Sequence, residues 1–187
     1  MAKRDLGSIG ELFPQSVFII ASYAADGTPN AMNAAWAGEC TRNEVCFNIG
    51  DHKTTQNIVE RKAFTVAPAD VAHVAEADYF GIATGKRVNK AQASGMTFVK
   101  SRHVDAPVIE EFPLTMECEV TSIDGDEHGA RIVGRVVNVC VDEDILDDEG
   151  RVDFCKLRPI VYDSTRRIYR EVGEVVGTAW DAGKRFL

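Results

Sequence analysis

Residues 52–55, with the sequence His-Lys-Thr-Thr, have side chains suited to holding a phosphate group. They lead directly into residues 56–62, whose composition is typical of a short helix. The start of a helix offers backbone N–H groups without internal partners and the positive end of the helix dipole. Lys53 would add a cation, and the hydroxyls of Thr54 and Thr55, either of which we predict as N-cap, would add hydrogen bonds. The alternative for a lysine at such a position is plain exposure to solvent.

Residues 30–38, Asn-Ala-Met-Asn-Ala-Ala-Trp-Ala-Gly, combine small side chains with two amides and one large ring. The small residues would let a flat ligand approach the backbone closely. The amides of Asn30 and Asn33 could pair with ring heteroatoms, and Trp36 could supply an apolar or stacking wall. This segment suits a heteroaromatic ligand, whereas the alternative for Trp36 is a place in the core.

Two further positions could contribute charge or a ring nitrogen. Residues 85–90, Gly-Lys-Arg-Val-Asn-Lys, form a basic patch in an acidic chain. His128 lies in the polar run 124–129, which predicts a hairpin turn from which its ring could reach across a cleft. The alternatives are a solvated surface and an exposed turn. Together, these segments would suit an anionic, flat, heteroaromatic ligand.

Common catalytic and nucleotide-binding motifs do not fit the sequence. Residues 81–86 are not a phosphate-binding loop, because the two glycines are four apart and Arg87 stands where Ser or Thr is needed. No G-x-G-x-x-G fingerprint occurs, and neither Asp-rich turn has a calcium-loop pattern. The four histidines have no second ligand at metal-binding spacing, and no nucleophile elbow is present. We therefore predict no metal site and assign no catalytic residue.

The elements that must position these segments are mostly short strands joined by turns. Apolar residues at 114, 116, 118 and 120 alternate with polar ones, which predicts a strand with one wet face in a hairpin with residues 132–141. Because strand-helix alternation is rare, we predict a mainly β fold, a Greek-key-like antiparallel β-barrel with inserted helices, in a single domain of residues 1–187. The expected strands are residues 16–23, 31–38, 44–49, 63–67, 114–121, 132–141, 157–162 and 167–172, and the expected helices are residues 56–62, 69–79 and part of the tail 173–183.

Length, charge and cysteine content limit the class of protein. The 187 residues carry 29 Asp and Glu against 21 Lys and Arg, a net charge of −8, and 45% of them are hydrophobic. A disordered chain would be less apolar, and a chain this acidic has no bulk attraction for nucleic acid. No apolar run suits a membrane span or a signal peptide, and the five cysteines form no C-x-x-C pair. We expect a soluble, cytoplasmic protein with reduced thiols that binds neither nucleic acid nor membranes.

Taken in order along the chain, these segments resemble the flavin reductase-like FMN-binding split barrels, in particular the flavoredoxin branch. The resemblance extends over nearly the whole chain and is carried by residues 14–20, 26–30, 34–36, 52–58, 101–107, 117–118, 128–129, 150 and 183–184. It implies that the isoalloxazine ring and the ribityl chain lie along Asn30, Asn33, Ala34, Ala35 and Trp36. It implies that the 5′-phosphate is surrounded by His52, Lys53, Thr54, Thr55 and Lys90, and that the ring is approached by His128 and Tyr162. Asn33 is a departure, because many relatives have Thr or Ser there.

The resemblance also implies a function and an assembly. It implies an FMN-binding flavoprotein that passes hydride or electrons from NAD(P)H, or from a redox protein partner, to an acceptor. FMN would carry the redox chemistry, and NAD(P)H would be a transient reductant. Family members are typically homodimers, so a homodimer is expected. The alternative is a non-catalytic split-barrel module that binds a flavin or haem.

Overall fold

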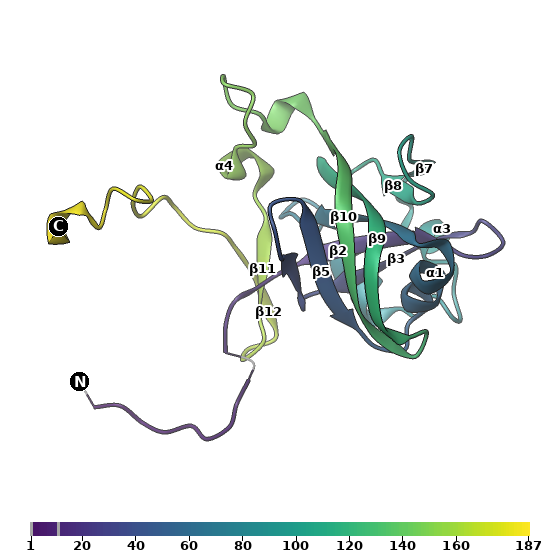
Figure 1. Cartoon of the computed structure of the whole chain (residues 1–187), viewed down its shortest axis with the longest axis horizontal. Helices are drawn as coiled ribbons and strands as arrows, with labels where there is room; N and C mark the ends of the chain where they lie inside the picture. Colours follow the sequence, from purple (N-terminus) through teal and green to yellow (C-terminus); the bar gives the residue numbers. More distant parts are fainter. Residues whose placement is uncertain (1, 11) are drawn as a thin grey trace.

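The computed structural model describes residues 2–10 and 12–187. Within them, one large antiparallel sheet curls into a half-barrel with the strand order β3-β2-β6-β9-β10-β5-β4 (Figure 1). Its strands are β2 (Phe18–Tyr23), β3 (Pro29–Ala34), β4 (Ala37–Glu39), β5 (Glu44–Ile49), β6 (Ala63–Pro68), β9 (Leu114–Asp126) and β10 (Gly129–Val141). The mainly β, antiparallel fold predicted from the sequence is confirmed.

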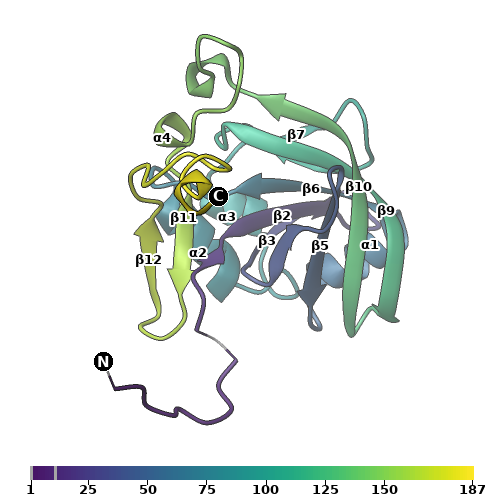
Figure 2. The ribbon, with the colours of Figure 1, turned by 60° about the vertical axis from the view of Figure 1, so that its left-hand side comes forward.

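Smaller sheets and short helices lie around the large sheet (Figure 2). The small sheet has the order β1-β11-β12, with β1 (Gln15–Ser16), β11 (Ile160–Asp163) and β12 (Ile168–Glu171), and a hairpin consists of β7 (Phe98–Lys100) and β8 (Pro107–Ile109). The helices are α1 (Lys53–Arg61), α2 (Val74–Ile82), α3 (Lys90–Ser94) and α4 (Phe154–Leu157), with the 3-10 turns η1 (Glu143–Ile145) and η2 (Lys184–Phe186). No helix in the described part of the chain is long and apolar enough to cross a membrane.

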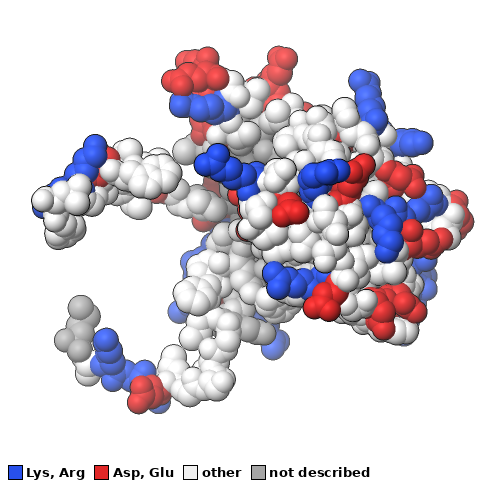
Figure 3. Space-filling view, in the orientation of Figure 1, with Lys and Arg blue, Asp and Glu red and all other residues white. Residues whose placement is uncertain are grey.

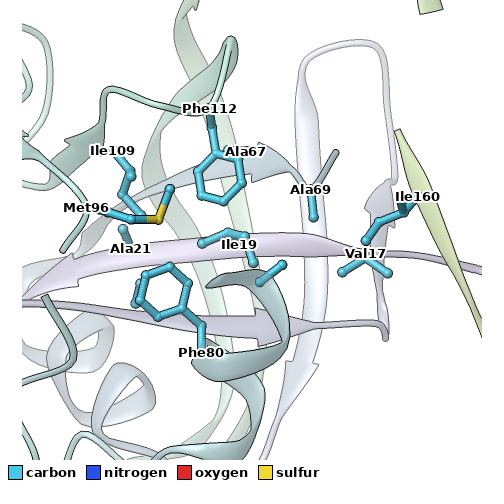
Figure 4. Close-up of a cluster of buried hydrophobic side chains, with 12 residues drawn as sticks. Val17, Ile19, Ala21, Ala67, Ala69, Phe80, Met96, Ile109, Phe112 and Ile160 are labelled. Atoms are coloured by element: carbon cyan, nitrogen blue, oxygen red, sulfur yellow. The ribbon is translucent and has the colours of Figure 1, made fainter. Parts of the chain in front are cut away.

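Apolar residues cover both faces of the large sheet, because successive side chains of a strand point to opposite sides. In β2, Ile20 belongs to the cluster inside the half-barrel, where Phe47 and Phe64 meet edge to face with ring centroids 5.0 Å apart. Ile19 belongs to a second cluster on the outer face, which contains Phe80 of α2 (Figure 4). β2 is therefore buried on both faces, which explains its continuous apolar sequence.

The predicted strand 31–38 is interrupted by a bend at Ala35 and Trp36. At this bend the chain passes from β3 to β4, which are the two edge strands of the large sheet. A backbone hydrogen bond from Asn48 N to Trp36 O, 3.0 Å long, holds the bend to β5. The segment 30–36 therefore lies along an open sheet edge, where backbone groups remain available.

The first part of β9 lacks the wet face that its alternating sequence predicts, whereas Glu119 and Thr121 further along the strand are exposed as predicted. Thr115 and Glu117 are buried, with exposed fractions of 2% and 3%. Ser101, in the loop after β7, donates from Oγ to Glu117 Oε1 at 2.5 Å, and Asn138 of β10 donates to Oε2. The covering loop comes from a distant part of the chain, and alternation along one strand cannot reveal such a contact.

α2 begins later than the predicted helix 69–79. Asp70 forms an isolated bridge with Pro159, and its carboxylate accepts a hydrogen bond from His73 N at 2.9 Å. These contacts hold the chain outside helical conformation until Val74. The helix then runs through Gly81, which does not interrupt it.

Both terminal segments stand off the body on the same side (Figure 1). The predicted helix within residues 173–183 is absent, and the 3-10 turn η2 follows that segment. In the space-filling view both segments carry uncharged side chains along much of their length, with charged ones near their ends (Figure 3). Their exposed apolar side chains are Leu6, Ile9, Leu12 and Phe13 at one end and Val172, Val175, Val176, Trp180, Phe186 and Leu187 at the other.

Candidate functional site

The site is built along the open edge of β3. Lys90 Nζ donates to Ala31 O at 2.9 Å, so this carbonyl points away from β2. In an antiparallel pair, alternate residues direct both backbone groups to the same side. Ala31 and Asn33 therefore direct their N–H and C=O groups to the open edge. Residues of α1, α2 and the segment 83–90 lie next to this edge.

The N-terminus of α1 reaches this edge without a side-chain cap. The N-cap is His52, in extended conformation and without a side-chain hydrogen bond to the helix, so the prediction of Thr54 or Thr55 as N-cap is wrong. The first backbone bond runs from Gln56 N to His52 O, which leaves the N–H groups of residues 53–55 without partners inside the helix. The first turn carries no acidic residue. These groups form a positive end that favours an anion.

The two threonines lie inside the first turn and are buried. Asn30 Nδ2 donates to Thr54 Oγ1 at 2.7 Å, which ties the start of α1 to β3 and leaves the Thr54 proton free to donate elsewhere. Thr55 Oγ1 donates to Gly50 O at 2.6 Å and so fixes the loop before the helix. The threonines therefore position the helix start, and Thr54 retains a donor.

Lys90 is a buried cation, 4% exposed. Its ammonium donates to Ala31 O at 2.9 Å and to Phe80 O at 2.8 Å, and it forms no ion pair with any carboxylate of the described residues. An ammonium has three N–H donors, so one remains for a ligand. Burial lowers the pKa of Lys90 to about 8. A buried positive charge without an anionic partner is costly, and a phosphate would supply that partner.

The burial of Lys90 leads to a pH-dependent stability. Between its folded pKa of about 8 and its ordinary value of 10.5, the unfolded chain binds more protons at this residue than the folded chain. The contribution of Lys90 to the free energy of unfolding should therefore rise as the pH increases through this window. The check is urea unfolding of the wild type and of Lys90→Met at several pH values, comparing the difference between their free energies of unfolding. Cys118 and Tyr169, whose pKa values are raised, also make stability depend on pH, but their contributions cancel in this difference. A difference between the two proteins that is flat with pH would contradict the prediction.

A cavity of about 220 Å³ brings most of these groups together. It is lined by Asn30, Met32, Asn33, His52, Lys53, Thr54, Phe80, Gly81, Ala83, Thr84, Gly85 and Lys90. A more open hollow of about 510 Å³ shares Asn30, Lys53 and Gly85 with it. A Cβ at Gly85 would lie 2.1 Å from Asn30 Oδ1 and 3.2 Å from Lys53 Cβ. The cavity therefore depends on the absence of a side chain at Gly85.

The charges around the cavity are mainly positive. Burial lowers the pKa of His52, and the nearby charges of Lys90 and Lys86 lower it further. Lys86 itself is paired with Asp51 at 2.6 Å, and the hydrogen bond from Lys86 is the main cause that lowers the pKa of Asp51. Lys53 forms no ion pair within the described residues, although its charge helps to lower the pKa of Asp26, so Lys53 and Lys90 are the cations of the cavity that no carboxylate contacts.

The other predicted site residues lie around the cavity but do not line it. His128 is exposed at the tip of the β9–β10 hairpin, with Nδ1 3.9 Å from Asp51 Oδ1. Trp36 is 56% exposed at the bend after β3, next to half-buried Ala35, and Ala34 packs its methyl group into the half-barrel core. Tyr162 lies on β11 beside Tyr169, with ring centroids 5.9 Å apart.

Sequence reasoning missed several residues that contribute to the site. Phe80 offers its backbone carbonyl to Lys90, and Gly81 lies beside Asn33. Tyr169, near the C-terminus, lies with its hydroxyl 3.5 Å from Asn33 Nδ2. No local signal marks these positions, because each contact joins distant segments. Among the described residues no group of three His, Cys, Asp or Glu side chains could hold a metal ion.

Comparisons with known proteins match the fold and the site region. A family model described as the flavin reductase-like domain matches residues 9–170. The flavoredoxin of Desulfovibrio vulgaris (Miyazaki F) has a TM-score of 0.92 and 34% identity, over 98% of this chain and 100% of that chain. The flavoredoxin from Methanosarcina acetivorans has a TM-score of 0.89 and 22% identity, over 99% and 100%. The FMN-binding protein from Thermus thermophilus has a TM-score of 0.76 and 18% identity, over 95% and 97%, a likeness of fold alone.

The match to the family model includes every element that lines the cavity, from β3 to the segment 83–90, and extends to β12. The flavoredoxin of Desulfovibrio vulgaris is also identical to this chain at 34% of positions, over 98% of the length of this chain. This protein therefore belongs to the flavin reductase-like domain family, with the split-barrel fold of the flavoredoxins.

Proposed function

We propose that this chain is an FMN-binding oxidoreductase of the flavin reductase and flavoredoxin type, with the flavin phosphate at the start of α1. The observation that carries the proposal is the meeting of an uncapped helix N-terminus, Lys53 and buried Lys90 at one cavity. Membership of the family supports a flavin-binding oxidoreductase, and FMN is the ligand in the name of one structural relative.

The residues present fit the phosphate of FMN. The free N–H groups of residues 53–55, the Thr54 hydroxyl and the third N–H of Lys90 are hydrogen-bond donors, and an anion accepts from donors. Lys90 adds a buried charge and Lys53 a half-buried one, and neither forms an ion pair with a carboxylate of the described residues. Gly85 leaves room beside Asn30, which a Cβ would fill.

The edge of β3 fits the remainder of the molecule. Three residues of extended strand separate Asn30 from Asn33, roughly 10 Å, which is the order of length of a ribityl chain. We assign Ala35, Trp36, His128 and Tyr162 to the surroundings of the ring, and Ala34 contributes there through its backbone alone, since its side chain packs in the core. In this proposal, the phosphate and ring ends of FMN lie at opposite ends of one open strand.

FMN supplies the redox chemistry when it is bound, because it accepts a hydride or passes single electrons. The chain then has to hold and orient it: Lys53 and Lys90 neutralise the phosphate, while Asn30 and Thr54 fix the helix start against β3. We propose that electrons come from NAD(P)H or from a redox protein partner. Anaerobic mixing with NADH or NADPH, followed by the visible absorbance of the flavin, separates these donors. Loss of absorbance with either nucleotide supports the reductase, and no loss with both overturns NAD(P)H as the donor.

Lys53→Ala should weaken FMN binding by about tenfold, because one phosphate contact from a half-buried cation is removed. Thr54→Ala should have an effect of similar size, since it removes both a donor and the partner of Asn30. Fluorescence-quenching titration measures both dissociation constants. Unchanged affinity in both variants would place the phosphate elsewhere.

We also propose that the protein is a homodimer in which a second copy covers the terminal segments. Val176 and Trp180 are 102% and 96% exposed, and large apolar side chains in such number are normally covered by a partner. Analytical ultracentrifugation should show a dimer for the full chain and dissociation after removal of residues 173–187. A monomer for the full chain at micromolar concentration would overturn the proposal.

A further inference from the structure

Tyr169 of β12 joins three elements next to the open edge of β3. Its hydroxyl donates to Asp78 Oδ1 of α2 at 2.8 Å. Asn33 of β3 directs its Nδ2 to Ala77 O, in the same turn of α2, at 3.0 Å, and to the Tyr169 hydroxyl oxygen at 3.5 Å. The three residues lie far apart in the sequence, and each is half-buried.

This network determines which way round the Asn33 amide lies. Nδ2 must face Ala77 O, because a carbonyl accepts and cannot donate. The one proton of Tyr169 goes to Asp78, so the phenol oxygen can only accept from Asn33. A flipped amide would bring Oδ1 against Ala77 O and against an oxygen whose proton is already engaged. The amide is therefore held with Nδ2 inward and Oδ1 as its remaining group.

Asn33 Oδ1 can only accept a hydrogen bond, because an amide oxygen carries no proton. Asn33 lines the cavity, so this acceptor is available to a ligand there. The Tyr169 phenol stays protonated at ordinary pH, since burial, followed by the hydrogen bond and charge of Asp78, raises its pKa to about 12. An Asp78 carboxylate would repel an ionised phenol, so Tyr169 stays the donor to Asp78 and the acceptor from Asn33. A Thr or Ser at position 33, with a rotatable hydroxyl, would not be restricted to accepting.

We propose that Asp78 and Tyr169 are positioning residues that hold Asn33 Oδ1 as a hydrogen-bond acceptor toward the flavin ring, and that this acceptor favours reduced over oxidised flavin. The proposal rests on the proposed binding of FMN. An oxidised isoalloxazine offers acceptors at most of its polar edge and a single N–H, whereas two-electron reduction adds N–H donors. A fixed acceptor therefore repels the acceptor atoms of the oxidised ring and forms a hydrogen bond with an N–H group that the reduced ring gains.

Tyr169→Phe removes the hydroxyl and keeps the ring, so the Asn33 amide keeps its hydrogen bond to Ala77 O but loses the second contact that holds it. The ratio of the dissociation constants of oxidised and reduced FMN should fall about tenfold, which corresponds to a midpoint potential about 30 mV more negative for a two-electron couple. Asp78→Ala should act in the same direction, because the freed Tyr169 proton can then donate to Asn33 Oδ1. Tyr23→Phe is the matched control, since it removes the phenol oxygen of a half-buried tyrosine of β2 that takes no part in this network, and it should leave the ratio unchanged.

A double-variant cycle separates positioning from general loss of structure. If Tyr169 acts through Asn33, then Asn33→Ala and Asn33→Ala/Tyr169→Phe should have the same potential, whereas independent effects would add. Additive shifts, or a potential that is unchanged in Tyr169→Phe and Asp78→Ala, would overturn the inference. The potentials are measured with enough FMN to saturate every variant, so that only bound flavin is compared; a wild type that binds no FMN would instead overturn the proposed function.

Discussion

Lys90→Met is expected to weaken FMN binding by about 100-fold, the larger of the charge effects at this site. The side chain is 4% exposed and has two backbone carbonyls as partners, so its charge is poorly screened by water. A phosphate beside it would gain a short, charge-assisted hydrogen bond in a water-poor setting, where such bonds are strongest. Lys53 is only half-buried, and its removal should therefore cost less.

Riboflavin provides the internal control for Lys90→Met, because it lacks the phosphate. Its affinity should change little if Lys90 acts on the phosphate, and should fall in parallel with that of FMN if the substitution distorts β3 and α2. Lys100→Met removes an exposed lysine of β7 and should alter neither affinity. Equal affinities of wild type and Lys90→Met for FMN would contradict the assignment.

Gly85→Ala is the second substitution for which we expect a large loss of FMN affinity, and it tests the shape of the site rather than its charge. The new methyl group would lie 2.1 Å from Asn30 Oδ1, so the Asn30 amide has to move. When the amide moves, its buried hydrogen bond to Thr54 breaks. The methyl group itself fills the space beside Lys53. We expect FMN affinity to fall by about 100-fold and the free energy of unfolding to fall by about 1–3 kcal/mol.

Gly38→Ala is the matched control for Gly85→Ala, because a Cβ at Gly38 meets no atom within 4 Å. Isothermal titration calorimetry and urea unfolding of both variants measure the two effects. Wild-type affinity in Gly85→Ala, with the Asn30 side chain shifted, would show that the ligand does not depend on this cavity.

The parts of the fold that follow from local sequence were predicted well. Residues 44–49 form β5 with the expected bounds, and β9 and β10 form the expected hairpin, with both strands extending into the predicted turn 124–129. In both cases the pattern that specifies the strand lies within the strand and its adjacent turn. The candidate phosphate segment, residues 52–55, also lies at a helix start, as its composition indicates.

The parts that depend on distant contacts were not predictable. Glu117 is read from sequence as solvent-facing, yet Ser101 and Asn138 hydrogen-bond its carboxylate inside the protein. His52 is the N-cap because the hydroxyls of the following threonines are drawn to β3 and to Gly50. Tertiary hydrogen bonds thus override a local capping preference that holds for an isolated helix.

The site shows the same division between local and long-range information. Asn30, Lys53 and Thr54 were predicted to act together, and the structure brings them to one cavity. The acceptor role that we propose for Asn33 depends on its contact with Tyr169, 136 residues away, for which the sequence carries no signal. Local motifs therefore point to the proposed anion end of the site, and the fold is needed to define the proposed ring end.

Parallel fluorescence-quenching titrations of the wild-type apoprotein with FMN and with riboflavin test the central claim most directly. If the N-terminus of α1, Lys53 and Lys90 hold the 5′-phosphate, FMN should bind at least about 100-fold more tightly than riboflavin. Equal affinity for the two flavins, or binding of neither, would contradict a phosphate site at the open edge of β3.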